Sequence, residues 1–203
     1  MERDVAVVQA SGRSLISQRD TPRGVAMSDV VRAALREDPD VLVLDDIRSA
    51  DVLTLALEAA APGRLVIAAC VARSAPAAVD RLIDLAPPSA RPGVQLALAN
   101  ALRGVVAQVL VKRIGGGRVA ARELLVNTPA VASLLAEGRT SALHAMMASR
   151  DAGMVPMNDV LAGLVSGGVV EARDACAAAV DPAALRAQLG QRGIDISGLE
   201  HLG

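Results

Sequence analysis

Two adjacent carboxylates, Asp45 and Asp46, are the strongest candidates for a chemical site in this sequence. They follow a continuous apolar run at 41–44, which is typical of a strand buried on both faces of a parallel sheet. The carboxyl ends of such strands form the ligand-binding edge of α/β proteins, so acids at this point can reach a ligand. The alternative is a structural role, in which the two acids cap the next helix or pair with Arg48.

Other residues with chemical potential stand alone. Ser74, Asp80 and His144 suit a hydrolase triad by type, but no GxSxG motif accompanies the serine. Cys70 and Cys176 have neither a CxxC partner nor a nearby histidine, which favours structural thiols over a metal or redox site. The sequence therefore predicts no second catalytic or metal centre.

The order of the predicted elements places Asp45 and Asp46 in an α/β domain. The alternation of strand, helix and strand around them is the βαβ unit of such domains. Three consecutive glycines at 115–117 separate two later strands and predict a hairpin turn, since no helix follows them as it would in a phosphate loop. The expected elements are a strand at 5–8, a helix at 28–38, strands at 41–44 and 65–69 joined by a helix at 50–61, helices at 76–85 and 93–107, and strands at 108–114 and 118–126.

The pattern changes after Asn127, where short helices divided by glycine and proline replace the strands. Thr128 as a cap, with Pro129 at the first helical position, marks the start of this region. We therefore expect an α/β core over residues 1–126 and a helical subdomain over residues 127–203.

Composition excludes several classes of function. The chain of 203 residues contains no Phe, Tyr or Trp, and its formal net charge is −1 with the basic residues scattered. This distribution provides no electrostatic footprint for nucleic acid. No apolar stretch approaches the roughly 18 residues of a membrane span, and the charged amino terminus lacks the apolar core of a signal peptide. We expect a cytoplasmic protein without direct membrane insertion.

Several segments, taken together and in this order, resemble the type IV pilus retraction (twitching motility) and type II secretion ATPase family. They are LISQRD at 15–20, RAALREDPDVL at 32–42, GRLV at 63–66, DRLID at 80–84, LRGVVAQ at 102–108, KRIGGGRVAA at 112–121 and TPAV at 128–131. The resemblance covers the carboxy-terminal half of such ATPases. It implies a RecA-like core of the P-loop NTPase superfamily, incomplete here, and a hexameric motor.

The resemblance also implies a nucleotide site. Asp46 occupies the position of the Walker B glutamate, which would hold Mg²⁺ through water, with Asp45 and Arg48 beside it as further contacts to Mg-ATP. However, the sequence contains no GxxxxGK[ST] loop to bind the phosphates, and its only lysine, Lys112, lies on a predicted strand. The segment at 7–13, where the family carries an acidic box, has no carboxylate.

Two further departures concern catalysis and movement. Val71 stands where the family has the histidine of its histidine box. The segment AVASLLAE at 130–137 replaces the family's AIRNLIRE, so that Ala132 and Ala136 take the places of two arginines. The apolar spacing of that helix is retained while its charges are lost.

These observations predict a degenerate homologue that does not hydrolyse ATP alone and acts as a scaffold or regulatory partner in a pilus or secretion motor. We expect a homo-oligomer, or a hetero-oligomer with motor ATPase subunits, without nucleic acid. One alternative is a fragment of an active hexameric ATPase that couples ATP hydrolysis to pilus retraction. The other is a free-standing binding or signalling module.

Overall fold

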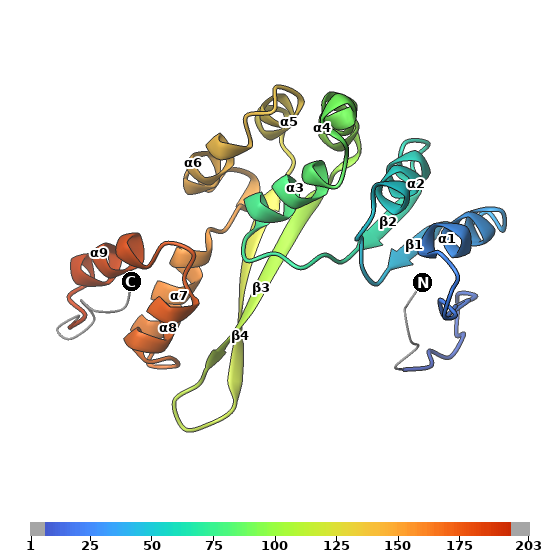
Figure 1. Ribbon diagram of the computed structural model, residues 1–203. Helices are drawn as coiled ribbons and strands as arrows, with labels where there is room; N and C mark the ends of the chain where they lie inside the picture. Colours follow the sequence, from blue (N-terminus) through green and yellow to red (C-terminus); the bar gives the residue numbers. More distant parts are fainter. Residues whose placement is uncertain (1–6, 196–203) are drawn as a thin grey trace. The chain divides into compact units, whose positions relative to one another are not determined.

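The computed structural model describes residues 7–195 and forms two compact units (Figure 1). Unit 1 contains the described residues up to 71 together with 80–102 and 135–138, and unit 2 contains 72–79, 103–134 and the described residues from 139 onward. Unit 2 thus combines strands with the carboxy-terminal helices, whereas the expected boundary lay at 126/127. The expected strand at 5–8 lies partly outside the described residues, and Val7 and Val8 are exposed and belong to no strand.

Unit 1 is built around a two-stranded parallel sheet. Val41 pairs with Leu65 and Leu44 with Ala68, which confirms the predicted βαβ unit. Ser49 caps α2 by accepting a hydrogen bond from the Val52 N–H at 3.3 Å. The elements are α1 (Met27–Leu35), β1 (Val41–Leu44), α2 (Ala50–Ala60), β2 (Leu65–Ala68) and α4 (Arg91–Ala101), with α3 (Ala75–Asp84) entering from unit 2.

Polar contacts in unit 1 join segments that carried the family resemblance. Arg64 donates to the carbonyl oxygen of Pro39 and to the carboxylate of Asp38, both at 2.5 Å, so it ties the starts of β1 and β2 together. Arg19 forms an ion pair with Glu37 just beyond α1. These contacts give the charged residues of the three segments a structural role within unit 1.

The expectation that the strand at 41–44 is buried on both faces is wrong. Leu42 and Leu44 are buried against α1 and α2, but the opposite face of the sheet is about half exposed, with Val43 at 52 % and Ile67 at 52 %. No element among residues 7–195 covers this second face. The helix expected at 93–107 also ends early, at Ala101, because Leu102 is extended and residues from Gly104 onward join the next strand.

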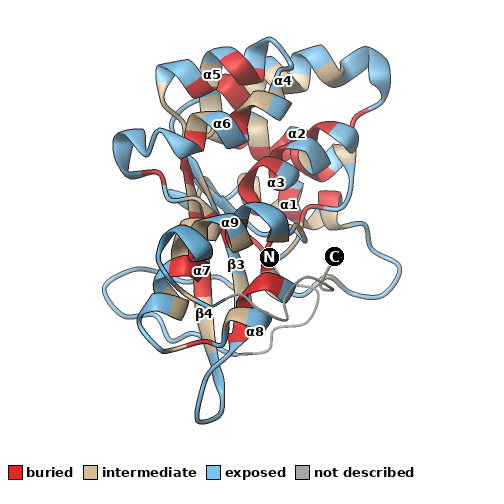
Figure 2. Cartoon of the chain, turned by 90° about the vertical axis from the view of Figure 1, so that its left-hand side faces the viewer, coloured by how far each residue is buried: buried red, intermediate tan, exposed pale blue. Residues whose placement is uncertain are grey.

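Unit 2 combines a long antiparallel hairpin with short helices. Its strands are β3 (Gly104–Lys112) and β4 (Arg118–Val126), and Gly115, Gly116 and Gly117 form the predicted turn with positive φ angles of 84°, 108° and 74°. Figure 2 shows that the free end of the hairpin is exposed. The helices are α5 (Pro129–Ala136), whose last residues belong to unit 1, and α6 (Leu143–Ala148), α7 (Met157–Ser166), α8 (Ala172–Ala178) and α9 (Pro182–Gln191).

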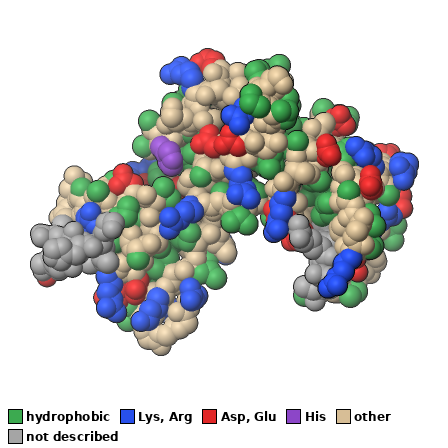
Figure 3. Space-filling view, viewed as in Figure 1, with side chains coloured by type: hydrophobic (Ala, Val, Ile, Leu, Met, Phe, Trp, Pro, Cys, Tyr) green, Lys and Arg blue, Asp and Glu red, His purple; other side chains and the backbone are tan. Residues whose placement is uncertain are grey.

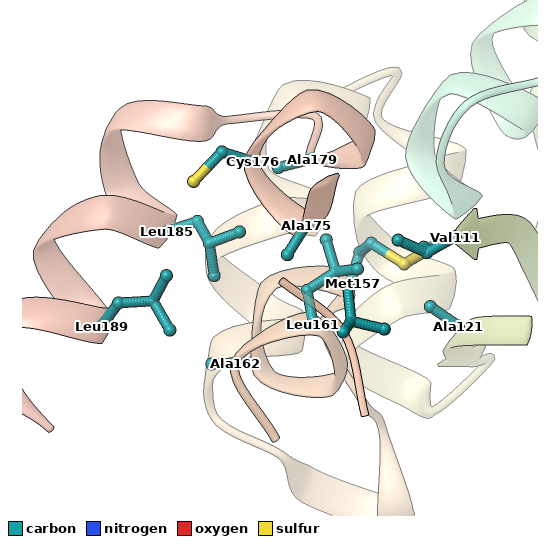
Figure 4. Close-up of a cluster of buried hydrophobic side chains, with 11 residues drawn as sticks. Val111, Ala121, Met157, Leu161, Ala162, Ala175, Cys176, Ala179, Leu185 and Leu189 are labelled. Carbon is teal, nitrogen blue, oxygen red and sulfur yellow. The ribbon is translucent and has the colours of Figure 1, made fainter. Parts of the chain in front are cut away.

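Side-chain caps start α5 and α9, and apolar packing holds α7, α8 and α9 on one face of the hairpin. Thr128 and Asp181 accept hydrogen bonds from the N–H groups of Val131 and Ala184 at 3.3 Å and 2.9 Å, and the first of these confirms the predicted helix start at Thr128. The core is made of Ala, Val, Leu and Met with one Cys, and contains no aromatic residue because the chain has none (Figure 4). Its buried members are Val111, Ala121, Met157, Leu161, Ala162, Val170, Ala175, Cys176, Ala179, Leu185 and Leu189.

Glu123 of β4 is the one buried carboxylate among the described residues, with 3 % of its surface exposed. One of its oxygens accepts a hydrogen bond from the N–H of Ala75 at 2.5 Å, and the other accepts from the N–H of Met157 at 3.1 Å. Ala75 and Met157 are the first residues of α3 and α7. Glu123 therefore satisfies unpaired donors at two helix amino termini, where a negative charge is also favoured by the helix dipole.

We expect Glu123→Ala to lower the free energy of unfolding by about 2–5 kcal/mol, because two buried N–H groups lose their acceptors. Glu123→Gln keeps one accepting oxygen and should lower the free energy of unfolding by a smaller amount. Urea unfolding followed by circular dichroism measures both changes. Glu171→Ala is the control, since Glu171 is exposed and its side chain caps nothing; a loss as large as that of Glu123→Ala would refute the role assigned to Glu123.

Candidate functional site

The predicted acids lie where β1 ends, beside a cleft of about 480 Å³ within unit 1. The backbone continues to pair there, because Ala69 N–H bonds to the Leu44 carbonyl and Ile47 N–H bonds to the Ala69 carbonyl, both at 3.0 Å. This pairing fixes the chain on either side of Asp45 and Asp46. The cleft is lined by Thr21, Pro22, Arg23, Gly24, Val25, Met27, Asp45, Asp46, Arg48, Ser49 and Val52.

Asp45 and Asp46 have different environments. Asp45 is exposed and follows the last residue of β1. The side chain of Asp46 is only 12 % exposed, and its Oδ2 pairs with Nε of Arg48. Its Oδ1 is buried and has no hydrogen-bond partner among the described residues. The structure therefore brings together Asp45, Asp46 and Arg48, but engages Asp46 internally.

The residues at this cleft do not by themselves fit a Mg²⁺ ion. Among residues 7–195 no group of three or more His, Cys, Asp or Glu side chains could hold a metal. Mg²⁺ in nucleotide sites is held by one or two carboxylates together with phosphates and water, so Asp45 and Asp46 would need phosphates positioned by another element. Arg23 and Arg48 are the cations that line the cleft, and no lysine lies there.

The residues at the histidine-box and acidic-box positions that the resemblance implies lack acid–base groups. Val71, at the histidine position, is 68 % exposed, and its side chain has no group that can donate or accept a proton. Gln9 and Arg13, at the acidic-box position, are exposed in irregular chain. The side-chain amide of Gln18 holds that chain, donating to the Val7 carbonyl at 2.9 Å. None of these residues can take a proton from water at neutral pH.

Of the three side chains that suit a hydrolase triad by type, Ser74 has a structural role in unit 2. Ser74 is 1 % exposed, and its Oγ accepts a hydrogen bond from the Ala77 N–H at 3.2 Å, so it caps α3. Asp80 belongs to unit 1, whereas Ser74 and His144 belong to unit 2, and both Asp80 and His144 are exposed.

Cys70, which the sequence predicts to be a structural thiol, lies near Asp46 and Arg81 in unit 1. Burial raises the pKa of Cys70; Arg81 counteracts this rise and the charge of Asp46 adds to it. At neutral pH the raised pKa keeps the thiol protonated and poorly nucleophilic. The signal in the sequence was the position of Cys70 directly after β2, at the same sheet edge as Asp46.

The family model for Type II/IV secretion system proteins matches residues 3–161. The chain belongs to the Type II/IV secretion system protein family. It is 34 % identical over 177 residues to the type IV pilus retraction ATPase PilT of Pseudomonas aeruginosa, covering 86 % of this chain and 52 % of that protein. It is 42 % identical over 157 residues to the uncharacterised protein YggR of Escherichia coli K12, covering 76 % of this chain and 48 % of YggR.

A solved structure gives the same assignment. The crystal structure of the pilus retraction motor PilT with bound ADP matches this chain with a TM-score of 0.77 and 32 % identity, covering 86 % of this chain and 50 % of PilT. The family predicted from the sequence and its incomplete RecA-like α/β core are confirmed. The chain spans about half the length of the relatives it matches. No helix within residues 7–195 has the length and apolarity needed to cross a membrane.

We expect the Asp46–Arg48 pair to couple measurably in a double-mutant cycle. Removing Arg48 leaves the largely buried Asp46 carboxylate unpaired, so Asp46→Ala, Arg48→Ala and the double variant should yield an interaction energy of about 1 kcal/mol. Urea unfolding of all four proteins measures it. The control is Asp29 with Arg32, an ion pair at 63 % and 53 % exposure, which should yield about 0.5 kcal/mol or less. Equal coupling in the two cycles would contradict the special environment of Asp46.

We also expect Cys70 to react slowly with iodoacetamide at neutral pH, because its raised pKa keeps the thiolate fraction small. Asp46→Asn removes a negative charge that raises this pKa, so the pKa should fall and alkylation should accelerate. Mass spectrometry of timed samples reports the rates. Cys176 is the internal control, since burial and Arg186, and not Asp46, act on its pKa. An unchanged Cys70 rate in Asp46→Asn would refute the coupling.

Proposed function

We propose that this chain acts as a non-catalytic scaffold or regulatory subunit in a type IV pilus or type II secretion motor. The observation that supports this most directly is the state of Asp46. The carboxylate at the Walker B position pairs with Arg48 through one oxygen and buries the other. A carboxylate held in this way is not presented to a Mg-nucleotide complex.

The phosphate side of the site points in the same direction. Catalysis of phosphoryl transfer depends on positioning and on charge stabilisation by a phosphate loop, its lysine and a residue that orients water. Within these 203 residues the only lysine, Lys112, lies exposed on β3, and no GxxxxGK[ST] sequence is present. Val71 and the segment at 7–13 supply no general base.

Helix α5 supports a role in assembly without force transmission. Its apolar residues Val131 and Leu135 are fully buried, whereas Ala132 and Ala136 stand where retraction-type relatives carry arginine. The partners we propose are further copies of this chain or motor ATPase subunits. The half-exposed apolar face of β1 and β2 supports association, because monomeric proteins rarely leave such faces uncovered.

The rival proposal is that these residues belong to an active hexameric ATPase whose phosphate loop lies on the half of the relatives that this chain does not span. The altered residues Asp46, Val71, Ala132 and Ala136 weigh against it. They lie inside the matched region and would remain altered in any longer protein.

We expect the chain alone to release no phosphate from Mg-ATP above background, because each missing group normally contributes several kcal/mol of transition-state stabilisation. A phosphate-release assay tests this, with Asp46→Ala as the matched control. Turnover that disappears in Asp46→Ala would show that the site is active and would favour the rival proposal.

The scaffold role is tested in the same experiment by adding the chain to intact PilT of Pseudomonas aeruginosa. Co-elution in size-exclusion chromatography and a changed rate of PilT turnover are expected if the chain enters the motor. Refractive index must be used for detection, since the chain has no Trp or Tyr. If neither co-elution nor a changed rate is observed, the result argues against the scaffold role and for a free-standing binding or signalling module.

A further inference from the structure

The hairpin of unit 2 has one face that packs on helices and one that does not. Alternate residues of each strand share a face, and the buried face includes Ala107, Val111, Ala121 and Leu125. The other face, called the outward face here, is formed by Val106, Gln108, Leu110 and Lys112 of β3 opposite Leu124, Arg122, Ala120 and Arg118 of β4.

Positive charge on the outward face is not compensated by the described part of the chain. Lys112, Arg118 and Arg122 lie on this face and Arg113 follows at the turn, and none of them forms an ion pair with the residues that the structure describes. Within residues 7–195 the Arg122 guanidinium donates only to the neutral side-chain oxygen of Gln108, at 2.8 Å. Figure 3 shows Lys and Arg side chains gathered over the free end of the hairpin.

Apolar side chains lie among these cations. Val106 is 63 % exposed and Leu110 is 54 % exposed, and both belong to the outward face. The turn is also fixed in place, because the N–H of Ile114 bonds to the Val169 carbonyl, beyond α7, at 2.9 Å. A charged and apolar surface that is already ordered loses little conformational entropy on binding.

We propose that the outward face of the hairpin docks an acidic segment of another protein. Carboxylates of that segment would pair with the Arg and Lys side chains, and its apolar side chains would cover Val106 and Leu110. Arginine matches carboxylates with two parallel hydrogen bonds, and three of the four cations are arginines. This surface lies outside the cleft at Asp46, so the inference does not depend on the proposed role in the motor.

Two other polyanions fit the face less well. Single-stranded nucleic acid is bound by aromatic stacking as well as by cations, and this chain contains no aromatic side chain. An anionic membrane is bound by proteins that add Trp, Phe or Leu to a basic face, and here the described apolar members are one leucine and one valine at high exposure. A protein segment with both carboxylates and aliphatic side chains complements both components of the face.

The test uses fluorescence anisotropy with three labelled peptides: one alternating Glu with Val, one alternating Glu with Ser, and one alternating Lys with Val. The full chain should bind the Glu–Val peptide most tightly, the Glu–Ser peptide more weakly and the Lys–Val peptide not at all. Reversing two cations in Arg118→Glu with Arg122→Glu should weaken Glu–Val binding by roughly tenfold or more and flatten its salt dependence.

A matched control carries the same change in charge on unit 1, as Arg32→Glu with Arg36→Glu on and after α1. It should bind the Glu–Val peptide like the unaltered chain, and circular dichroism should show both double variants folded. Leu110→Ser should weaken the binding of the Glu–Val peptide but not the binding of the Glu–Ser peptide. If the hairpin variant fails to fold, this single substitution carries the test.

Several results would overturn the proposal. One is equal weakening in the hairpin and control variants, which would indicate general attraction by net charge. Another is tighter binding to polyuridylate or to phosphatidylglycerol vesicles than to the Glu–Val peptide. A third is light scattering that shows a dimer dissociated by Arg118→Glu with Arg122→Glu, which would assign the face to a second copy of this chain.

Discussion

Most of unit 2 depends on a single buried charge, the carboxylate of Glu123. It accepts backbone hydrogen bonds at the starts of α3 and α7, two helices that are remote from each other in the sequence. An ionised carboxylate in an apolar core is costly unless its oxygens are satisfied, and the four amide groups at a helix start are costly unless accepted. The carboxylate satisfies the helix N–H groups and these N–H groups satisfy the carboxylate, so the packing of α3, β4 and α7 is interdependent.

The regular elements could be predicted from local patterns, whereas Glu123 could not. The strands at 41–44 and 65–68, the turn at 115–117 and the capped helix starts follow from periodicity, glycine and side-chain caps, which act over a few residues. A glutamate in an alternating strand predicts a solvent-exposed position. Its role as a hydrogen-bond acceptor depends on the first residues of α3 and α7, which are distant in the sequence. The same distance dependence explains the error at β1 and β2, where a continuous apolar run predicts burial without revealing which elements cover each face.

At the candidate site the sequence predicted which residues meet but not how they are used. Asp46 and Arg48 are two positions apart at the end of β1, so their proximity follows from the chain itself. Asp46 Oδ1 is buried, and the cleft beside Asp46 is lined by Thr21 and Met27 as well as by Val52 of α2, residues that the spacing of the two acids does not reveal. Type and spacing therefore predicted two acids at the end of β1, and only the packing showed that Asp46 pairs with Arg48 through one oxygen while its other oxygen is buried.

The contrast between α5 and the hairpin follows from the unequal energies of packing and surface charge. Burying Val131 and Leu135 contributes roughly 1.5–3 kcal/mol each, whereas an exposed arginine contributes about 1 kcal/mol or less to stability. Alanine at positions 132 and 136 of α5 is therefore compatible with the stability of the fold. By the same reasoning, stability does not require Lys112, Arg113, Arg118 and Arg122, which form no ion pairs within the described residues. Cations that the fold does not need, held among exposed apolar side chains on an ordered surface, are best explained by something that binds there.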